Sequence, residues 1–361
     1  MSIETSRWLR FASSCAMFAL SRMCPGPPHA SSMGLVSGLL LLFAPVAGWA
    51  AEGELDRGFG DGGVVWPDRH SSWESRMSVA VDSQHRAVLA GTSENTYYVV
   101  RYLETGEPDP SFGVAGIVET GIIGSYRASA GVVIQDGGAV VLGGNDGSVG
   151  EHFVARYLPT GEPDDAFGVG GVAHTGFHSV VFSHIAVASQ TDGKIVLAGN
   201  HDASGEHFVA RFDTDGSLDM TFGVDGVVWT GFYCNYSSPL DVAIQSDGRI
   251  LLASPHPNEG EFFVMRFDTT GAPDPGFGNN GLLLTGISAS EGSKVALAVQ
   301  EEDRILLAGT YLREDLVARL LPNGDLDASF GDGGTTSSGI PSVAGANLEL
   351  AVSDDQRVLL A

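Results

Sequence analysis

A short motif that recurs six times limits what this chain can fold into. The pair Phe-Gly, with an aspartate three residues before the phenylalanine, returns every 53 to 55 residues. Self-similarity at a fixed period of this length is the signature of a repeat architecture. The six phenylalanines are Phe59, Phe112, Phe167, Phe222, Phe277 and Phe330.

Each repeat predicts four short strands. In the unit that starts at Phe222, Gly226 precedes an apolar segment, 227–230, and an alternating segment, 242–245, ends at the turn signal Asp247-Gly248. Asp-Gly between β-rich runs predicts a hairpin. Two more β-rich segments follow, and none has helical periodicity. We therefore expect one four-stranded meander per unit.

Sheets of this kind predict an all-β fold, a β-propeller of about six four-stranded blades. A lone four-stranded sheet cannot bury both faces, whereas sheets stacked around an axis can. A β-sandwich array and a parallel solenoid are the alternatives, and a solenoid usually has a shorter period. We expect a leader over 1–50 and a repeat domain over 51–361. Its units lie near 59–111, 112–166, 167–221, 222–276, 277–329 and 330–361, the last of them partial.

The sixth unit stops at Ala361, inside its third expected strand, so we expect an incomplete last blade. Either the ring is open at an edge or the sequence is a truncated reading of a longer gene. Truncation is favoured, because an exposed apolar edge strand promotes aggregation.

The stretch RFDTDGSLDMTFG resembles a calcium loop through Asp213, Asp215 and Asp219. In the other repeats the counterparts of Asp215 are mostly threonine or asparagine, which do not complete a calcium shell. The glycine that follows, Gly216, does recur, which predicts a turn with positive φ. We interpret the stretch as a turn and keep one weak calcium site at the three aspartates as the alternative, with no other cofactor expected.

A recurring arginine lies eight residues before the recurring aspartate. Because the arginine falls in a strand and the aspartate in a connector, we expect the two side chains to meet, within a blade or across to its neighbour. The arginines are Arg101, Arg156, Arg211, Arg266 and Arg319.

Phrases in every unit resemble the delta-60 repeat family of secreted bacterial proteins. The phrases that carry the resemblance are DGRILLA at 247–253, FVARF at 208–212 and GSLDMTFG at 216–223. The resemblance covers nearly all of 52–361. It implies a β-propeller-like repeat domain and no particular activity, because that family is largely uncharacterised and offers no catalytic motif to carry over.

The first 50 residues predict a secretory signal peptide. Arg7, Arg10 and Arg22 precede an apolar run over 33–44, and small residues lead to a cleavage point after Ala50. We expect a secreted or periplasmic protein whose mature chain does not insert into a membrane, because the run is short for a transmembrane helix. An uncleaved anchor is the alternative.

The formal net charge of −25, with few and scattered basic residues, excludes nucleic acid and anionic membrane as natural partners. No nucleotide-binding loop, serine-nucleophile elbow or zinc-ligand spacing occurs. We therefore expect a monomer whose partner is a protein or a glycan.

The first and third loops of each unit vary in length and chemistry, and they fall on one face of a meander. Variable polar loops on a rigid scaffold are where binding surfaces usually form. The candidate ligand-binding residues in these loops are Tyr126, Arg127, His178, His184, His201, Tyr233, Tyr236 and His256.

A second set of candidates stands three residues after the recurring glycine. If the strand that contains it is the innermost of its blade, its side chains ring the central channel; packing between blades is the alternative. The positions hold Trp66, Glu119, His174, Trp229, Leu284 and Ser337, of which the two tryptophans, Glu119 and His174 are ligand candidates.

These patterns predict an exported, non-enzymatic scaffold that binds a protein or a glycan at the cell envelope. One alternative is a propeller enzyme that acts on a glycan through channel carboxylates, for which Glu119 is the single candidate. The other is a purely structural envelope repeat.

Overall fold

The computed structural model describes residues 57–65, 76–125, 127–179, 183–201, 205–233, 238–289, 293–311, 314–341, 348–352 and 356–360. These residues are strands joined by turns, with one 3-10 turn at η2 (Glu301–Asp303). The first sheet contains β1 (Ser78–Val81), β2 (Ala87–Ser93), β3 (Thr96–Tyr102) and β4 (Ile117–Ile123). The second contains β5 (Gly131–Ile134), β6 (Val140–Asp146), β7 (Glu151–Tyr157) and β8 (Val172–His178). The third contains β9 (Ile185–Ser189), β10 (Ile195–Asn200), β11 (Glu206–Phe212) and β12 (Val227–Tyr233).

The remaining strands form two more complete sheets and a pair. The fourth sheet contains β13 (Asp241–Ile244), β14 (Ile250–Pro255), β15 (Glu261–Phe267) and β16 (Leu282–Ser288). The fifth contains β17 (Val295–Val299), β18 (Ile305–Tyr311), β19 (Glu314–Leu320) and β20 (Thr335–Pro341). The described part of the sixth holds β21 (Leu350–Val352) and β22 (Val358–Leu360).

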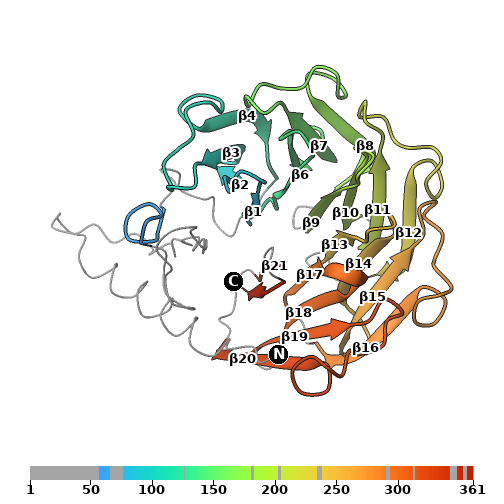
Figure 1. The fold of residues 1–361 in the computed structure, drawn as a ribbon. Coiled ribbons are helices and arrows are strands. Elements are labelled where there is room, and N and C mark those ends of the chain that lie inside the picture. Colours follow the sequence, from blue (N-terminus) through green and yellow to red (C-terminus); the bar gives the residue numbers. More distant parts are fainter. Residues whose placement is uncertain are drawn as a thin grey trace, which may run out of the picture.

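The sheets stand side by side around an axis, which makes the molecule a β-propeller (Figure 1). Within each four-stranded blade, consecutive strands pair antiparallel. The strands that contact one another from blade to blade are β1, β5, β9, β13, β17 and β21, so these are innermost. The predicted fold class is therefore confirmed, with five four-stranded blades among the described residues.

The radial order of the strands differs from the order that the sequence suggested. The strand after each Phe-Gly is the outermost one of its blade, at the periphery in Figure 1 (β4, β8, β12, β16 and β20). The hypothesis that the strand after Phe-Gly is innermost, so that its side chains line the channel, is therefore wrong. Each sequence unit begins with the last strand of one blade and continues with three strands of the next.

Middle and outer strands show why these sequences suit their places. In β10 every residue is buried, because the strand lies between neighbouring blades, and its sequence IVLAGN is almost wholly apolar. In β12 the second half alternates between exposed and partly buried residues, as an outer strand with one solvated face requires.

The hairpins predicted at Asp-Gly are present, with a longer connection than two residues. Between β9 and β10 the residues 190–194 form the loop, where the Gly193 N–H donates to the Gln190 carbonyl at 3.0 Å. Gly193 has a φ of 85°. The glycine is needed because this turn places a residue in the left-handed region.

The recurring phenylalanines are the anchors of the core. All six are at most 5% exposed. The four largest hydrophobic clusters each combine side chains from two adjacent blades. Burying one such ring is worth about 1.5–3 kcal/mol. Phe59 is 1% exposed, and the Gly60 N–H donates to the Thr105 carbonyl of the first blade at 2.8 Å, as Gly113 does to Thr160 at 2.7 Å. The motif at Phe59 therefore occupies the position of a connector that precedes the first blade.

The predicted meeting of arginine and aspartate is confirmed in five repeats. In each, the arginine Nε donates to the aspartate Oδ2, as between Arg211 and Asp219 at 2.7 Å. The same guanidinium lies over the recurring phenylalanine, 4.5 Å from the ring centroid of Phe222, and donates across to the Thr269 carbonyl of the next blade at 2.7 Å. The arginine thus joins strand, connector and neighbouring blade. The other pairs are Arg101–Asp109, Arg156–Asp164, Arg266–Asp274 and Arg319–Asp327.

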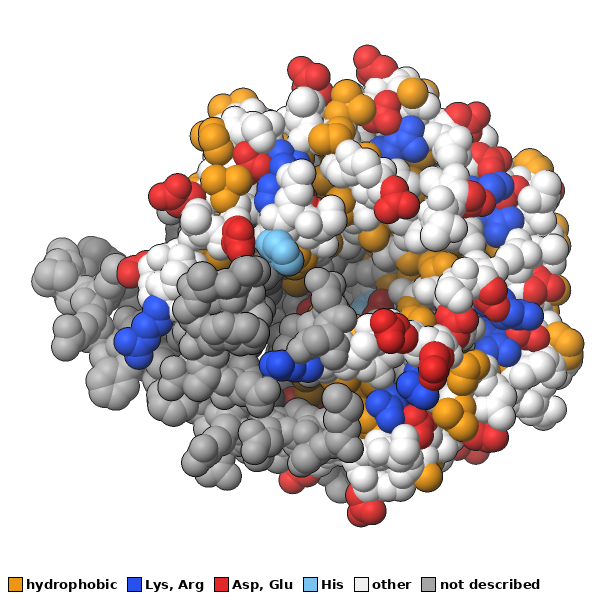
Figure 2. Space-filling view, viewed as in Figure 1, with side chains coloured by type: hydrophobic (Ala, Val, Ile, Leu, Met, Phe, Trp, Pro, Cys, Tyr) orange, Lys and Arg blue, Asp and Glu red, His pale blue; other side chains and the backbone are white. Residues whose placement is uncertain are grey.

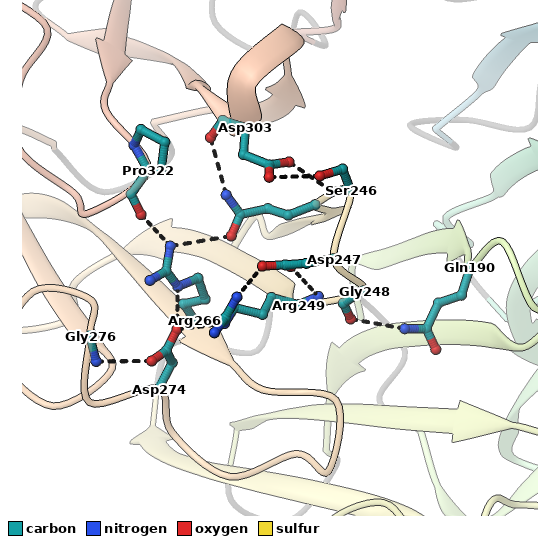
Figure 3. Close-up of polar contacts among 11 residues, drawn as sticks. Gln190, Ser246, Asp247, Gly248, Arg249, Arg266, Asp274, Gly276, Asp303 and Pro322 are labelled. Carbon is teal, nitrogen blue, oxygen red and sulfur yellow. Dashed lines mark hydrogen bonds and ion pairs between the residues drawn. The ribbon is translucent and has the colours of Figure 1, made fainter.

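A recurring glutamine adds a second link between blades, shown in Figure 3 with the fourth blade at its centre. The Gln190 side-chain amide donates to the Gly248 carbonyl of the next turn at 3.0 Å, and Gln245 donates likewise to the Asp303 carbonyl at 3.1 Å. The Ser246 N–H and hydroxyl both donate to the Asp303 carboxylate, each at 2.7 Å. We call this surface of Asp-Gly turns and connectors the turn face.

The recurring glycine of the connector has the predicted positive φ and a second reason to be glycine. Gly216 has a φ of 86°, and a Cβ there would lie 2.6 Å from the Gly168 nitrogen of the preceding blade. That approach is closer than any side chain permits. The glycine is therefore required by the turn and by the contact between blades.

Near the opposite face, a buried polar relay passes from blade to blade. His207 lies between the Asn200 side-chain amide, whose Nδ2 donates to Nδ1 at 2.9 Å, and the Ser254 hydroxyl, 2.9 Å from Nε2. Burial lowers the pKa of His207 to about 4, so the ring is neutral at physiological pH. The relay continues toward the first blade through His152, Asn145 and Tyr97.

Candidate functional site

The variable loops gather on one face, as predicted. The loop after β4 contacts the loop after β6, where the Gly147 N–H donates to the Ile123 carbonyl at 2.7 Å and Gly124 pairs with Asp146. Ser179 and His201 form the same bridge one blade further on. Because strands alternate in direction, this variable-loop face lies opposite the turn face. The innermost strands begin at the variable-loop face.

The candidates on the outermost strands lie at the periphery, far from the axis in Figure 1. Glu119 is exposed on β4, and the Nε2 of His174 on β8 lies 3.2 Å from the Asp146 Oδ2. Trp229 on β12 is 42% exposed. They would have lined the channel only if the strand after Phe-Gly were innermost, and that strand is outermost. Trp66 lies outside the described residues.

Several loop candidates take part in aromatic contacts on the variable-loop face. The His201 ring lies 5.1 Å from Trp229 and 6.0 Å from Phe177. His256 packs in the same way against Phe232 at 5.2 Å, and its Nδ1 accepts a backbone N–H from Asn258. Both histidines are therefore built into the loops by their ring contacts.

The other loop candidates are spread over this face. Tyr233 is 58% exposed at the end of β12, and His178 lies near the Gly150 carbonyl. Arg127 has a φ of 60°. Of the loop candidates that the structure describes, only His184, which is 4% exposed, lines the cavity on the axis. Tyr126 and Tyr236 lie outside the described residues.

A cavity of about 220 Å³ lies on the axis where the innermost strands begin. It is lined from six blades, and five of its side chains are charged or titratable. We call this set the channel-mouth cluster; it consists of Arg76, His184, Asp241, Lys294 and Glu349.

Two equivalent positions of the repeat supply the cluster. Seventeen residues after the recurring phenylalanine stand Arg76, His184 and Lys294, from the first, third and fifth blades. Nineteen residues after it stand Asp241 and Glu349, from the fourth and sixth. Positions two apart on a strand face the same side, about 6–7 Å apart along it. The bases thus form a layer above the acids.

The second blade leaves room for contact across the channel. Its two equivalent positions hold the small residues Ser129 and Gly131. A guanidinium NH1 of Arg76 therefore reaches the Nδ1 of His184 on the third blade, at 2.5 Å. Because arginine can only donate, Nδ1 accepts, and His184 is neutral with its proton on Nε2.

The two acids of the cluster hold their protons unusually well. Burial raises the pKa of Asp241 to about 6, although its oxygens accept backbone N–H groups from Leu297 at 2.7 Å and Val242 at 2.8 Å. Burial, and next the charge of Asp241, raise the pKa of Glu349 to about 8. Asp241 ionises first, and its charge then helps to keep Glu349 protonated.

The two cations of the cluster have lowered pKa values, so they lose their protons more readily than usual. Burial, and next the charge of Arg76, lower the pKa of Lys294 to about 8. Burial lowers the pKa of Arg76 to about 10. At neutral pH both remain largely charged while Glu349 is largely neutral. The channel-mouth cluster therefore carries a positive charge within a chain whose net charge is −25.

Acidic side chains are scattered over the face seen in Figure 2, with Lys and Arg between them. In the proposed calcium loop, the Lys194 ammonium lies between Asp213 at 2.6 Å and Asp219 at 2.7 Å, whereas Asp215 accepts from Ser217 in its own turn. The three carboxylates therefore do not converge. Among the described residues, no group of three or more His, Cys, Asp or Glu is placed to hold a metal ion.

A family model described as a β-propeller domain of unknown function, DUF5122, matches residues 190–222, 245–277 and 301–330. Each match runs from an Asp-Gly turn or its equivalent to a recurring phenylalanine, and leaves out the channel-mouth cluster. No curated protein matches the sequence. In the described residues, no helix has the length and apolar character to cross a membrane.

Solved structures resemble the chain at low identity. A virginiamycin B lyase from Staphylococcus aureus has a TM-score of 0.45 and 10% identity, over 80% of this chain and 84% of its own. An alpha-L-arabinofuranosidase from Fusarium graminearum has a TM-score of 0.48 and 11% identity, over 78% and 85%. The polysaccharide lyase Uly1 has a TM-score of 0.43 and 10% identity, over 79% and 76%. Similarity at this level supports no statement about activity, and what is shown is a repetitive all-β propeller.

Proposed function

We propose that the protein is an exported, non-enzymatic scaffold that binds a glycan or a protein at the cell envelope, and that the ligand enters the channel mouth from the variable-loop face. The observation that carries this proposal is the channel-mouth cluster itself. Titratable groups from five blades converge at two positions of the repeat where the other units have Ser, Pro, Gly, Ala or Asn.

The cluster is costly to the fold, which supports a role in binding. Burying charged groups costs free energy unless hydrogen bonds and counter-charges compensate. Within the described residues, the Lys294 ammonium and the Glu349 carboxyl make no hydrogen bond or ion pair. Strongly shifted pKa values in a concave site are typical of functional sites.

The experiment is a screen of glycans, small metabolites and envelope proteins against the full chain, with two matched variants. Lys294→Ala removes a positive charge at the channel mouth, and Arg304→Ala removes one on the turn face of the same blade. We expect the Lys294 variant to lose binding and the Arg304 variant to keep it. Equal loss in both, or a screen without ligands, would contradict the proposal.

Export is tested separately by the mass of the protein recovered from the envelope or medium of cells that express the full gene. We expect a mature chain that begins at Ala51, because small residues precede that position. A protein that retains residues 1–50 would contradict cleavage. Residues 1–56 lie outside the described residues.

The two channel acids favour one second candidate, a glycan hydrolase. A protonated acid beside an ionised carboxylate is the arrangement that such enzymes use, and Glu349 and Asp241 have the corresponding pKa order. The test is hydrolysis of 4-nitrophenyl glycosides. Turnover that disappears in both Asp241→Asn and Glu349→Gln would establish the enzyme; turnover unchanged in either variant would dismiss it.

A further inference from the structure

We infer that the ligand of the channel mouth is acidic, and that the site holds an oxyanion, such as the carboxylate of an acidic sugar, between Arg76 and Lys294. This inference rests on the proposed function and adds the chemical class of the ligand. It follows from the two cations of the cluster and from the placement of its acids.

Both cations line the same cavity, and among the described residues no carboxylate forms an ion pair with either of them. The charge of Arg76 acts on Lys294 strongly enough to lower its pKa. Among the described residues the Arg76 side chain makes one hydrogen bond, to the ring of His184, so its other N–H donors remain available to a ligand. Two like charges held together in a cavity favour an anion between them.

The acids of the cluster do not supply that anion. Both oxygens of Asp241 accept backbone N–H groups, from Val242 and Leu297. Glu349 is largely protonated at neutral pH. Among the described residues neither acid forms an ion pair with Arg76 or Lys294. An oxyanion would therefore meet two cations above and two acids below, whose protonated forms can donate to ligand hydroxyls.

The same geometry makes binding depend on pH. Three of the five titratable groups that face the cavity change charge over this range, and each makes the cavity more negative as pH rises. Asp241 gains negative charge near pH 6, and near pH 8 Glu349 gains it and Lys294 loses its positive charge. Arg76 stays charged throughout and donates to the Nδ1 of His184. Affinity for an anion therefore falls in two steps, being highest below pH 6.

The test is isothermal titration calorimetry of the folded full chain with sodium D-glucuronate, sodium sulfate and D-glucose at pH 5.5, 7.0 and 8.5. We expect glucuronate or sulfate to bind at least about tenfold more tightly than glucose, and affinity to fall about tenfold or more between pH 5.5 and 8.5. The tighter of the two anions identifies the oxyanion as a carboxylate or a sulfate. Glucose that binds as tightly, or affinity that rises with pH, would overturn the inference.

Variants assign the effect to named residues. Lys294→Gln and Arg76→Gln should each weaken the anion about tenfold at pH 5.5, and Arg304→Gln on the turn face should not. Asp241→Asn should retain binding and lose the step near pH 6. Lys294→Gln keeps the test valid if Arg76→Gln fails to fold, because no described group pairs with the Lys294 ammonium.

The outcomes separate this inference from the proposed function. If a neutral ligand binds and Lys294→Ala abolishes its binding, the channel mouth is a binding site and the oxyanion inference is wrong. If no ligand responds to any channel-mouth variant, both are wrong.

Discussion

The molecule uses aspartate and glutamate in two opposite ways on its two faces. On the turn face, burial alone would raise the pKa of Asp219, but hydrogen bonds from Lys194, Thr221 and Arg211 outweigh burial and hold the pKa far below its ordinary value. In the channel mouth, burial raises the pKa of Asp241 and Glu349. The surroundings of Asp219 stabilise its ionised form, whereas those of Asp241 and Glu349 destabilise theirs.

This contrast separates support from recognition. The aspartate that is paired in five repeats strengthens the structure around its connector, and these contacts occupy its hydrogen-bonding capacity. Poorly paired charges at two positions of the innermost strand lower stability and leave chemistry available for a ligand. The next four predictions test this division, beginning with the largest effect.

Removal of the carboxylate from one arginine–aspartate pair should reduce stability the most. Asp219→Asn leaves the guanidinium of Arg211, whose side chain is 6% exposed, without its counter-charge. We expect a loss of roughly 3–5 kcal/mol in the free energy of unfolding by chemical denaturation. The control is Asp136→Asn, at an exposed turn position, which should change stability by at most about 0.5 kcal/mol. Equal losses of stability in Asp219→Asn and Asp136→Asn would show that the Arg211–Asp219 pair does not stabilise the contact between blades.

The next largest loss of stability should come from a methyl group at the connector glycine, Gly216. Gly216→Ala places a Cβ 2.6 Å from the Gly168 nitrogen at a φ of 86°, so the blades must separate, at a cost of roughly 2–3 kcal/mol. Gly176 has a φ of 79° with open space around its Cβ position. Gly176→Ala should therefore cost only about 1 kcal/mol, for the backbone alone. Thermal melting of the two variants compares them, and a reversed order would contradict the proposed contact.

The buried relay should make the protein sensitive to mild acid. The pKa of His207 is about 4 in the folded chain and about 6.5 in an unfolded one. Because the depressed pKa means that only the unfolded state takes up the proton between these values, stability falls by about 1.4 kcal/mol per pH unit as pH drops from about 6.5 to 4. Unfolding measured at pH 7 and 5 should show this loss, and His207→Gln should reduce it by about 2 kcal/mol. An unchanged slope in the variant would mean that His207 does not remain neutral.

A channel-mouth change should have the smallest effect on stability and the opposite sign. Glu349 has a pKa of about 8 when folded, so between about pH 4.5 and 8 folding requires uptake of a proton. Glu349→Gln imitates the protonated form without that cost. Linkage sets an upper limit of about 3 kcal/mol on this cost at pH 7, and because Glu349 is only partly buried we expect the variant to be about 1 kcal/mol more stable there and equal to the wild type below pH 4.5. A loss of stability at pH 7 would place Glu349 with the supporting residues.

The sequence predicted the scaffold because the scaffold is repeated. The Phe-Gly pair, the glycine at Gly216 and the Arg211–Asp219 pair each answer a steric or electrostatic demand that returns at every boundary between blades. Comparison of the repeats within one chain therefore identified them. The radial order of the strands could not be obtained in this way, since a meander has the same sequence pattern whichever edge faces the axis.

The site was harder to predict because it breaks the repeat. Glu119 was the candidate channel carboxylate, but it lies on the outermost strand, and among the candidates that the structure describes only His184 lines the cavity. The available signal was the column of residues seventeen and nineteen positions after the phenylalanine. There titratable residues such as Arg76 and Glu349 stand where the remaining units have Ser, Pro, Gly, Ala or Asn. Charge at an otherwise small or neutral position of a buried strand is what indicates a site.

Hydrogen–deuterium exchange of the full chain, with and without saturating D-glucuronate at pH 5.5, tests most directly whether recognition and support lie on different faces. The account predicts slower exchange where the innermost strands begin, in 76–81, 183–189, 238–244, 293–299 and 348–352, and no change in the Asp-Gly turns. Protection centred on the turns at 190–194 and 245–250, with none at the channel mouth, would contradict it.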